Sequence, residues 1–288
     1  MILEESYTLN NGVNIPKLAL GTWLIDDAAV ADAVRAAVEI GYRHIDTAQA
    51  YGNERGVGEG VRACGIPRDE LFVVSKVAGE HKTYEEAAVG IDDTLAKTGL
   101  DYLDMMIIHS PQPWVEVNQS DNRYPEGNIA AYRALEDALA AGKLRAIGVS
   151  NFLIDDLRNI LDNCTVVPAV NQVLAHVGNV PFELARFCAD NGIAVEAYSP
   201  IAHGEAGRIE GIADMAAKYG VTVAQLCIRY VIQLGMIALP KTANPARMRE
   251  NAAIDFEIAP EDMDALNEAG GLADYGDHSF WPVYGGKL

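Results

Sequence analysis

The sequence predicts an α/β fold, a (β/α)8 TIM barrel, from two observations. Eight short apolar runs alternate with segments that have the length and pattern of helices. The runs cover residues 18–23, 44–46, 72–76, 105–109, 147–151, 169–172, 194–198 and 237–241. The last seven each end on a polar, ionisable or aromatic side chain of the sort used in catalysis or binding. In a parallel barrel all strands end on one face, which is where such barrels do chemistry.

Size and composition fit one barrel. The chain has 288 residues, and we expect a single domain over 1–288. Half of the residues are hydrophobic, so a large core can be buried. The net charge of −19 argues against nucleic acid or an anionic membrane as partner, because binding to phosphate groups needs a basic surface.

We expect neither a signal peptide nor a transmembrane helix. The first residues lack the basic and apolar segments of a signal peptide, and Gln225, Arg229 and Gln233 interrupt the longest apolar region, 221–240. The four cysteines are widely separated, which is typical of reduced thiols. We therefore expect a cytoplasmic protein, and a monomer.

The first elements have clear local signals. An Asn-Gly turn lies between alternating apolar positions in 7–15, which predicts an N-terminal β-hairpin that closes the barrel floor. After the first strand, Asp26 and Asp27 are candidate caps of a helix that ends at Gly41. Capping boxes at Thr83 and Thr222 begin two further helices.

The remaining segments complete the repeat. Helices are predicted over 53–62, 128–141, 154–161, 181–190, 208–218 and 245–252. Two segments fall outside it. Residues 110–127 form a long polar loop after the fourth strand, and 271–288 form a C-terminal aromatic tail whose aromatic density predicts docking onto some other surface.

Four ionisable side chains are expected to meet at the barrel mouth. Asp46, Lys76 and His109 end the second, third and fourth strands, and Tyr51 follows Asp46 by five residues. A Lys ammonium beside a phenol lowers the phenol's pKa, and a carboxylate keeps the Lys charged. Each residue alone has an ordinary structural interpretation, as a helix cap or an exposed strand end. Together they predict that Tyr51 is a proton donor with a lowered pKa.

The sequence resembles the aldo-keto reductases in motifs that cover nearly the whole chain. These are residues 41–54, Lys76, 103–109, 148–152, 171–172, 198–200, 240–242, Arg247 and Asn251. The resemblance implies NADPH-dependent reduction of an aldehyde or ketone, without a metal. It also implies a tetrad in which Tyr51 protonates the carbonyl oxygen, Lys76 activates Tyr51, Asp46 pairs with Lys76, and His109 orients the carbonyl.

A candidate anion site lies at the start of the last predicted helix. Asn244 is a capping residue and Pro245 a first-turn proline, and free amides at such a start attract anions. The resemblance implies that the adenosine 2′-phosphate of NADPH binds there, with NADH as a weaker alternative. The residues implied are Lys241, Thr242 and Arg247 at the phosphate and Glu250 and Asn251 near the adenine. An ordinary capped helix with exposed basic residues is the alternative.

The resemblance also assigns the nicotinamide site. Ser150, Asn151 and Gln172 would hold the carboxamide, and Tyr198, followed by Ser199, would stack on the ring. Without the resemblance, Tyr198 is equally a core tyrosine.

Aromatic side chains are candidates for the walls of an apolar substrate pocket, namely Trp23, Trp114, Phe152 and Trp281. Ordinary packing is the alternative for each. Ser110 follows the active-site His where many relatives carry Trp, so the pocket shape differs. The stretch 201–207 is short, as in the microbial 2,5-diketo-D-gluconate reductase branch, which implies a less tightly strapped NADPH.

Two other classes of function compete with a reductase. One is a cofactor-sensing binding protein on the same scaffold. The other is a metallohydrolase that uses His44, Asp46, His109 and His176, although no second H-x-H pair completes the ligand set. The identity of the carbonyl substrate stays open, because a fold does not name the molecule that fills a variable pocket.

Overall fold

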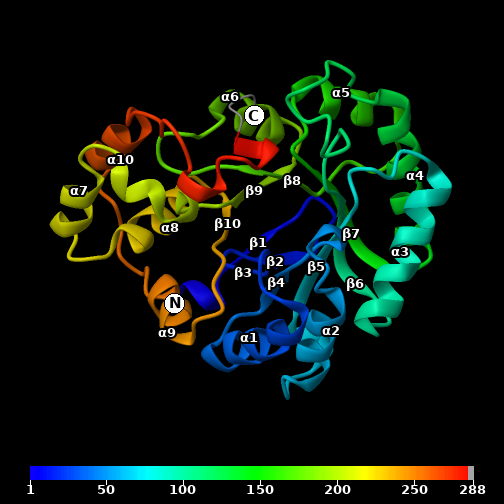
Figure 1. Cartoon of the computed structure of the whole chain (residues 1–288), viewed down its shortest axis with the longest axis horizontal. Coiled ribbons are helices and arrows are strands. Elements are labelled where there is room, and N and C mark those ends of the chain that lie inside the picture. The colour runs from blue at the N-terminus through cyan, green and yellow to red at the C-terminus, as the bar shows by residue number, and fades with distance from the viewer. Residues whose placement is uncertain (285–288) are drawn as a thin grey trace.

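The computed structural model describes residues 1–284 and shows a closed parallel barrel surrounded by helices (Figure 1). Its strands follow chain order from β3 to β10, and each pairs in parallel with the next. Parallel bridges between Leu18 and Ala238 and between Gly21 and Lys241 close the ring. The barrel strands are β3 Leu20–Gly21, β4 His44–Asp46, β5 Phe72–Val77, β6 Leu103–Ile108, β7 Leu144–Ser150, β8 Val170–Leu174, β9 Ala194–Tyr198 and β10 Ile237–Leu239. The predicted TIM barrel is confirmed.

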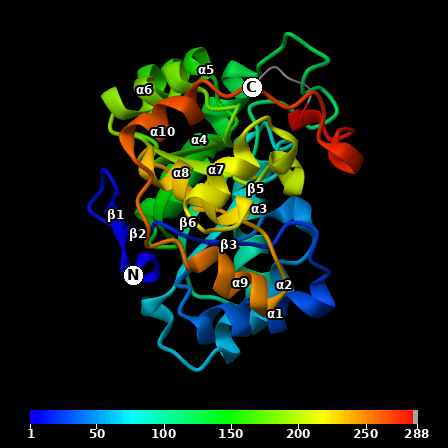
Figure 2. The same ribbon diagram turned by 90° about the vertical axis from the view of Figure 1, so that its left-hand side faces the viewer.

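Helices cover the outside of the strands (Figures 1 and 2). They are α1 Asp27–Ile40, α2 Glu54–Ala63, α3 Tyr84–Thr98, α4 Pro125–Ala140, α5 Ile154–Asn163, α6 Phe182–Asp190, α7 Ile212–Lys218, α8 Val223–Gln233, α9 Pro245–Ala252 and α10 Pro260–Asn267. The segment predicted as helical from residue 208 begins only at Ile212, because Ala202–Arg208 forms a kinked 3₁₀ segment. Helix α10 was not predicted from the sequence. None of the helices in 1–284 is long and apolar enough to cross a membrane.

The predicted hairpin is confirmed and lies across the ring of strands in Figure 1. Strands β1 Ser6–Thr8 and β2 Asn14–Pro16 are antiparallel, and Gly12 takes the positive φ of 83° that the turn requires. Leu9 and Ile15 pack against inward-facing side chains from the start of several barrel strands, among them Phe72, Met105, Val170 and Ile237. The hairpin therefore seals the barrel floor with apolar contacts.

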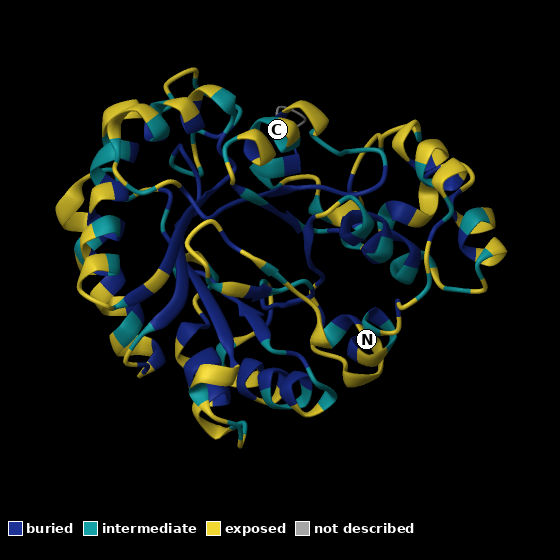
Figure 3. Ribbon diagram, turned by 180° about the vertical axis from the view of Figure 1, so that it is seen from behind, coloured by how far each residue is buried: buried dark blue, intermediate teal, exposed yellow. Residues whose placement is uncertain are grey.

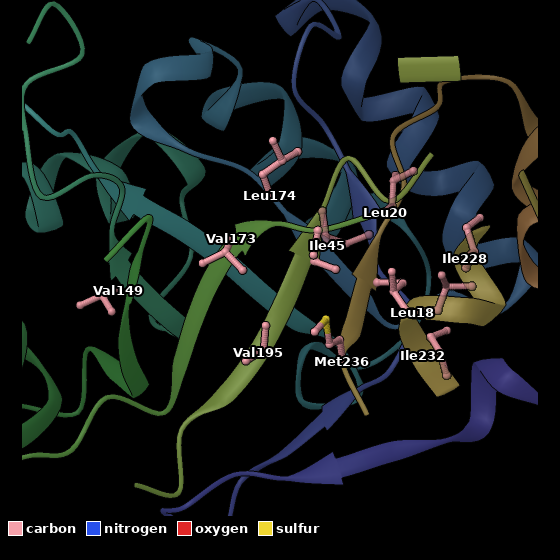
Figure 4. Close-up of a cluster of buried hydrophobic side chains, with 14 of the residues drawn as sticks. Leu18, Leu20, Ile45, Val149, Val173, Leu174, Val195, Ile228, Ile232 and Met236 are labelled. Carbon is pink, nitrogen blue, oxygen red and sulfur yellow. The ribbon is translucent and has the colours of Figure 1, made fainter. Parts of the chain in front are cut away.

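A second apolar layer lies between the strands and the helices. Figure 4 shows part of it, with Leu20 and Ile45 on the strands, Leu18 just before β3, and Ile228 and Ile232 on α8. The barrel strands are buried almost throughout, apart from the exposed Arg145 on β7 and the half-buried ends of β9, whereas the helices are buried mainly on the face toward the strands (Figure 3). This is the pattern expected when helices cover a closed parallel sheet.

The predicted caps of α3 and α8 are confirmed, and those of α1 are wrong. Thr83 Oγ1 accepts a hydrogen bond from the Glu86 amide, and Thr222 Oγ1 from the Gln225 amide, each at 3.2 Å. Asp26 holds the N-cap position of α1, but its side chain makes no capping bond among the described residues. Asp27 instead accepts from the Gly56 amide at 2.7 Å. Its carboxylate thus joins α1 to the first turn of α2, a contact that sequence spacing does not reveal.

The aromatic tail docks as predicted over 271–284, and the surface on which it docks is the mouth end of the barrel. Residues 285–288 of the predicted tail lie outside the described residues. The hydroxyl of Tyr275 lies 2.8 Å from His176 Nε2, and that of Tyr284 lies 3.0 Å from Ser199 Oγ. The side-chain amide of Asn118 donates to the Pro282 carbonyl, which ties the tail to the long loop after β6.

Candidate active site

Lys76 is the centre of the polar cluster at the barrel mouth. Its side chain has an exposed fraction of 0%. Its ammonium donates to both carboxylate oxygens of Asp46, at 2.7 and 2.8 Å, and to the Thr47 carbonyl at 2.8 Å. The fourth neighbour is the Tyr51 hydroxyl, 3.2 Å from Nζ. A buried ammonium is tolerated only with such partners, because loss of hydration is costly. The predicted Asp46, Lys76 and Tyr51 cluster is present in the structure.

Strand register brings these side chains together. Asp46 ends β4 opposite Val74, and Lys76 lies near the end of β5 opposite Ile107. Side chains alternate along a strand, so Asp46 and Lys76 point into the same interior. Tyr51 follows in the 3₁₀ turn Gln49–Tyr51, directly before α2.

Asn53 fixes this turn, and the sequence reasoning missed its role. Its amide nitrogen donates to the Thr22 and Ile25 carbonyls at 2.9 Å, and its carbonyl oxygen accepts from Thr47 Oγ1 at 2.7 Å. In sequence it has the position of a helix cap, yet its side chain makes no capping bond within residues 1–284. It holds the ends of β3 and β4 around Tyr51 instead.

His109 completes the predicted tetrad. It follows β6, and its ring centroid lies 5.5 Å from that of Tyr51 and 4.9 Å from that of Trp114. Burial, and then the charge of Lys76, hold the pKa of His109 well below its usual value. The imidazole is therefore neutral at pH 7 and can donate or accept a hydrogen bond without carrying charge.

The expected direction of the Tyr51 pKa is wrong. Burial, and then the negative charge of Asp46, raise the pKa of the Tyr51 phenol well above its ordinary value. Sequence reasoning counted the ammonium of Lys76 but not the loss of hydration, which is the larger effect here. Tyr51 therefore keeps its proton at neutral pH. Its use as a donor then depends on the Lys76 ammonium, 3.2 Å from its hydroxyl, to stabilise the anion that forms.

The residues predicted to hold a nicotinamide surround the tetrad. Asn151 Nδ2 donates to the His109 carbonyl at 3.0 Å, and Asn151 Oδ1 accepts from the Tyr198 hydroxyl at 2.8 Å. Ser150 Oγ donates to the Gln172 carbonyl at 2.9 Å, and Gln172 Nε2 donates to Asp46 Oδ2 at 3.1 Å. The ends of β7, β8 and β9 thus form one hydrogen-bonded surface beside Tyr51.

The predicted anion site is a capped helix start with free basic side chains. Asn244 Oδ1 accepts from the Ala246 and Arg247 amides at 2.8 and 3.4 Å, and Thr242 Oγ1 accepts from the Asn244 amide at 3.0 Å. Lys241 and Arg247 have no carboxylate partner among the described residues. Asn251 is buried and Glu250 is half-buried on the same helix. The site combines unpaired positive charge with a helix N-terminus, which suits a phosphate group.

Three of the four predicted aromatic pocket residues lie at the mouth. Trp23 and Trp281 pack edge to face with centroids 5.1 Å apart, and Trp114 packs against the ring of His109. All three are partly exposed. Phe152 is 0% exposed and belongs to the main hydrophobic core. Its position after a strand end resembles that of a mouth residue, but the structure turns it into the core, which corrects the prediction.

The tail adds a cluster that the sequence reasoning did not identify. His203, from the loop after β9, stacks on His278 with centroids 4.1 Å apart and packs 5.4 Å from Trp23. Tyr284 bonds to His203 and to Ser199. Aromatic density in the tail was the available signal, but its partner residues are far away in sequence.

The residues of the metallohydrolase alternative do not converge. Within residues 1–284, no group of three or more His, Cys, Asp or Glu side chains is arranged to hold a metal ion. His176 bonds to the Val177 carbonyl and to Tyr275. His44 lies deeper in the barrel, with its Nδ1 atom 3.2 Å from the Pro16 carbonyl.

Comparison with known proteins places the chain in a family. The model of the "Aldo/keto reductase family" matches residues 17–270, and the chain belongs to this family. An uncharacterized oxidoreductase of Bacillus subtilis is 40% identical over 275 residues, covering 92% of this chain and 94% of the relative. The glyoxal reductase of the same organism is 38% identical over 267 residues, covering 92% of each.

Solved structures agree with this assignment. A Bombyx mori aldo-keto reductase in complex with NADP superposes with a TM-score of 0.82 at 31% identity, over 97% of this chain and 98% of that one. The predicted resemblance is therefore confirmed at the level of the family, and the chain is an oxidoreductase. The branch suggested by the short stretch 201–207 stays a prediction.

Proposed function

We propose that this protein reduces an aldehyde or ketone to the alcohol with NADPH, and that Tyr51 donates the proton to the carbonyl oxygen. The observation that carries the proposal is the position of the Lys76 ammonium, which binds Asp46 and lies 3.2 Å from the Tyr51 hydroxyl. Family membership and the NADP in the complex of the Bombyx mori relative support the cofactor. When bound, NADPH supplies the hydride.

Tyr51, Lys76 and His109 divide the proton chemistry. As the carbonyl carbon accepts the hydride, the O–H bond of Tyr51 breaks and its proton moves to the carbonyl oxygen. The phenol oxygen then gains negative charge beside the Lys76 ammonium, which stabilises the transition state more than the ground state. Asp46 keeps Lys76 in place. Neutral His109 donates a hydrogen bond that orients the carbonyl.

The other predicted residues would position the cofactor. The side-chain amide nitrogens of Asn151 and Gln172 donate hydrogen bonds to protein acceptors. The Oε1 atom of Gln172 therefore remains to accept a hydrogen bond from the carboxamide of the cofactor. Tyr198 offers a flat face at the end of β9, Ser199 follows it in the chain, and Ser150 lies beside Asn151, which accepts from the Tyr198 hydroxyl. Lys241, Thr242 and Arg247 would bind the 2′-phosphate, which favours NADPH over NADH. Glu250 and Asn251 would contact the adenine.

The test is an initial-rate assay of NADPH consumption with glyoxal, sugars, keto acids and aromatic aldehydes. Wild-type protein should oxidise NADPH with at least one of them. Tyr51→Phe should lower kcat by roughly 10²–10⁴-fold while NADPH still binds, because only the proton donor is lost. Tyr84→Phe, which removes an exposed hydroxyl bonded to Asp137, is the matched control. Wild-type turnover in Tyr51→Phe would exclude the assigned role, and NADPH binding without consumption would favour a cofactor-sensing protein.

A further inference from the structure

A second carboxyl group lies beneath the tetrad, inside the barrel. Glu196 is in the middle of β9, and its side chain is 0% exposed. The amide nitrogen of Gln172 lies 3.0 Å from Glu196 Oε2 and 3.1 Å from Asp46 Oδ2. One amide group therefore links Glu196 to the carboxylate that holds Lys76.

His44 faces the other oxygen of Glu196. Its Nδ1 atom lies 3.2 Å from the Pro16 carbonyl, which can only accept, so Nδ1 carries the hydrogen. Burial lowers the pKa of His44 to about 4, so the ring is neutral and its Nε2 atom is an acceptor. Nε2 lies 3.8 Å from Glu196 Oε1, and neither atom has a hydrogen-bond partner among the described residues.

These two atoms are both acceptors unless Glu196 is protonated. With a hydrogen on Oε1, Glu196 can donate to His44 Nε2 after a small approach, and two buried unsatisfied atoms become partners. The charged groups that face this pair are Asp46 on β4 and Lys76 on β5. Asp104 on β6 acts on His44 only from a distance, since its carboxylate is paired with Arg68 and Arg145. Lys76 is already paired with Asp46, so a second negative charge would lack a partner of its own.

We propose that Glu196 carries a proton at neutral pH and acts as a positioning residue of the reductase. It donates to His44 and accepts from Gln172, and so turns Oε1 of Gln172 toward the cofactor face. It also leaves Asp46 as the one ionised carboxylate beside Lys76. The catalytic consequence rests on the proposed reduction of carbonyls, whereas the protonation of Glu196 does not.

Loss of this proton should slow the reaction at alkaline pH. Burial and the charge of Asp46 raise the pKa of Glu196 to about 8, so the carboxyl ionises as the pH rises through that value. The added negative charge disfavours the negative charge that develops on Tyr51. Between pH 5 and 8 the folded protein holds a proton that the unfolded chain has released, so this group lowers stability as the pH rises.

Glu196→Gln and Glu196→Leu test the proposal. Glutamine imitates the protonated carboxyl, so Glu196→Gln should keep most of the turnover at pH 7 and lose the alkaline fall in kcat. Its Tm should rise relative to wild type as the pH increases from 5 to 8. Glu196→Leu removes the acceptor of the Gln172 amide, so Gln172 is no longer held in position. This variant should lower kcat with NADPH by up to roughly 10²-fold.

Infrared spectroscopy provides a readout that is independent of turnover. Wild-type protein at pH 7 should show the carbonyl stretch of a protonated carboxylic acid, and Glu196→Gln should lack it. The matched control is Glu54→Gln, which removes a buried carboxyl bonded to the Ser75 and Thr94 hydroxyls, and it should keep the band. An identical spectrum in wild type and Glu196→Gln would overturn the protonation. If the band is present but the protein reduces no carbonyl compound, the protonation of Glu196 is supported and the proposed function is refuted.

Discussion

The floor and the mouth of the barrel interior are built from the same strands, yet they differ in chemistry. Strand β5 contributes Phe72 and Val74 to the floor and Lys76 to the mouth. Strand β6 places Met105 and Ile107 on the floor, and His109 follows at its end. Among interior side chains, position along the strand therefore decides whether a residue packs in the floor or joins the polar cluster at the mouth.

The difference follows from what closes each end. The hairpin covers the floor with Leu9 and Ile15, so apolar side chains there lose nearly all contact with water. At the mouth, loops bring carbonyls and hydroxyls that satisfy buried charge, as Thr47 and Tyr51 do for Lys76. A packed floor thus fixes the strands whose ends carry the charged groups.

The largest effect is expected at the mouth, for Lys76→Met. The substitution leaves Asp46 as a buried carboxylate without its cation, which costs roughly 3–5 kcal/mol of stability. Turnover should fall by about 10²–10⁴-fold, because Tyr51 loses the charge that stabilises its anion. Denaturant unfolding and NADPH consumption measure the two effects, and NADPH binding should stay nearly intact. Turnover like that of wild type would remove Lys76 from the mechanism.

On the floor, Met105→Ala should lower the free energy of unfolding by about 2–5 kcal/mol, since it leaves a cavity in a fully buried layer. The kcat of the folded protein should change little, because Met105 lies on β6 four residues before His109 and does not belong to the polar cluster. Thermal unfolding and initial rates at a temperature well below Tm check this. If kcat falls as steeply as stability, the floor and the mouth are not separable.

A smaller effect is expected for Arg247→Ala, outside the interior. Losing a charge-assisted hydrogen bond of about 1.5–3 kcal/mol should weaken NADPH binding by roughly 10–100-fold. NADH lacks the phosphate and should be affected little. Fluorescence titration measures both affinities, and Arg249→Ala on the same helix is the control because its guanidinium lies toward the Pro245 carbonyl. Equal losses for the two cofactors would refute the phosphate site.

The smallest effect is expected for Thr222→Ala, at the start of α8. Loss of the cap to the Gln225 amide should cost about 1 kcal/mol of stability, with kcat and both cofactor affinities unchanged. Thr83→Ala at α3 should behave in the same way, since its cap has the same geometry. A loss of activity in either variant would mean that helix ends influence the mouth.

The comparison also explains which predictions succeeded. The barrel was predictable because the strand runs and their polar ends repeat in chain order, and parallel pairing brings those ends together without any further information. The meeting of Asp46, Lys76 and His109 followed from this rule, whereas Tyr51 was placed by its short distance from Asp46 along the chain. The rule failed for Phe152, because a residue after a strand end can turn into the core or toward the mouth, and only the path of the backbone decides.

The sequence by itself determined the order of the barrel elements, the hairpin turn, the capping boxes and the strand ends that carry Asp46, Lys76 and His109, because these depend on local patterns. Only the tertiary structure decided that Asp27 joins two helices, that Asn53 braces the Tyr51 turn, and that Glu196 faces His44. It also showed that the pKa of Tyr51 is raised, where the sequence had predicted a lowered pKa. Burial and distance between residues far apart in the chain control these properties, and neither is written in any local stretch of sequence.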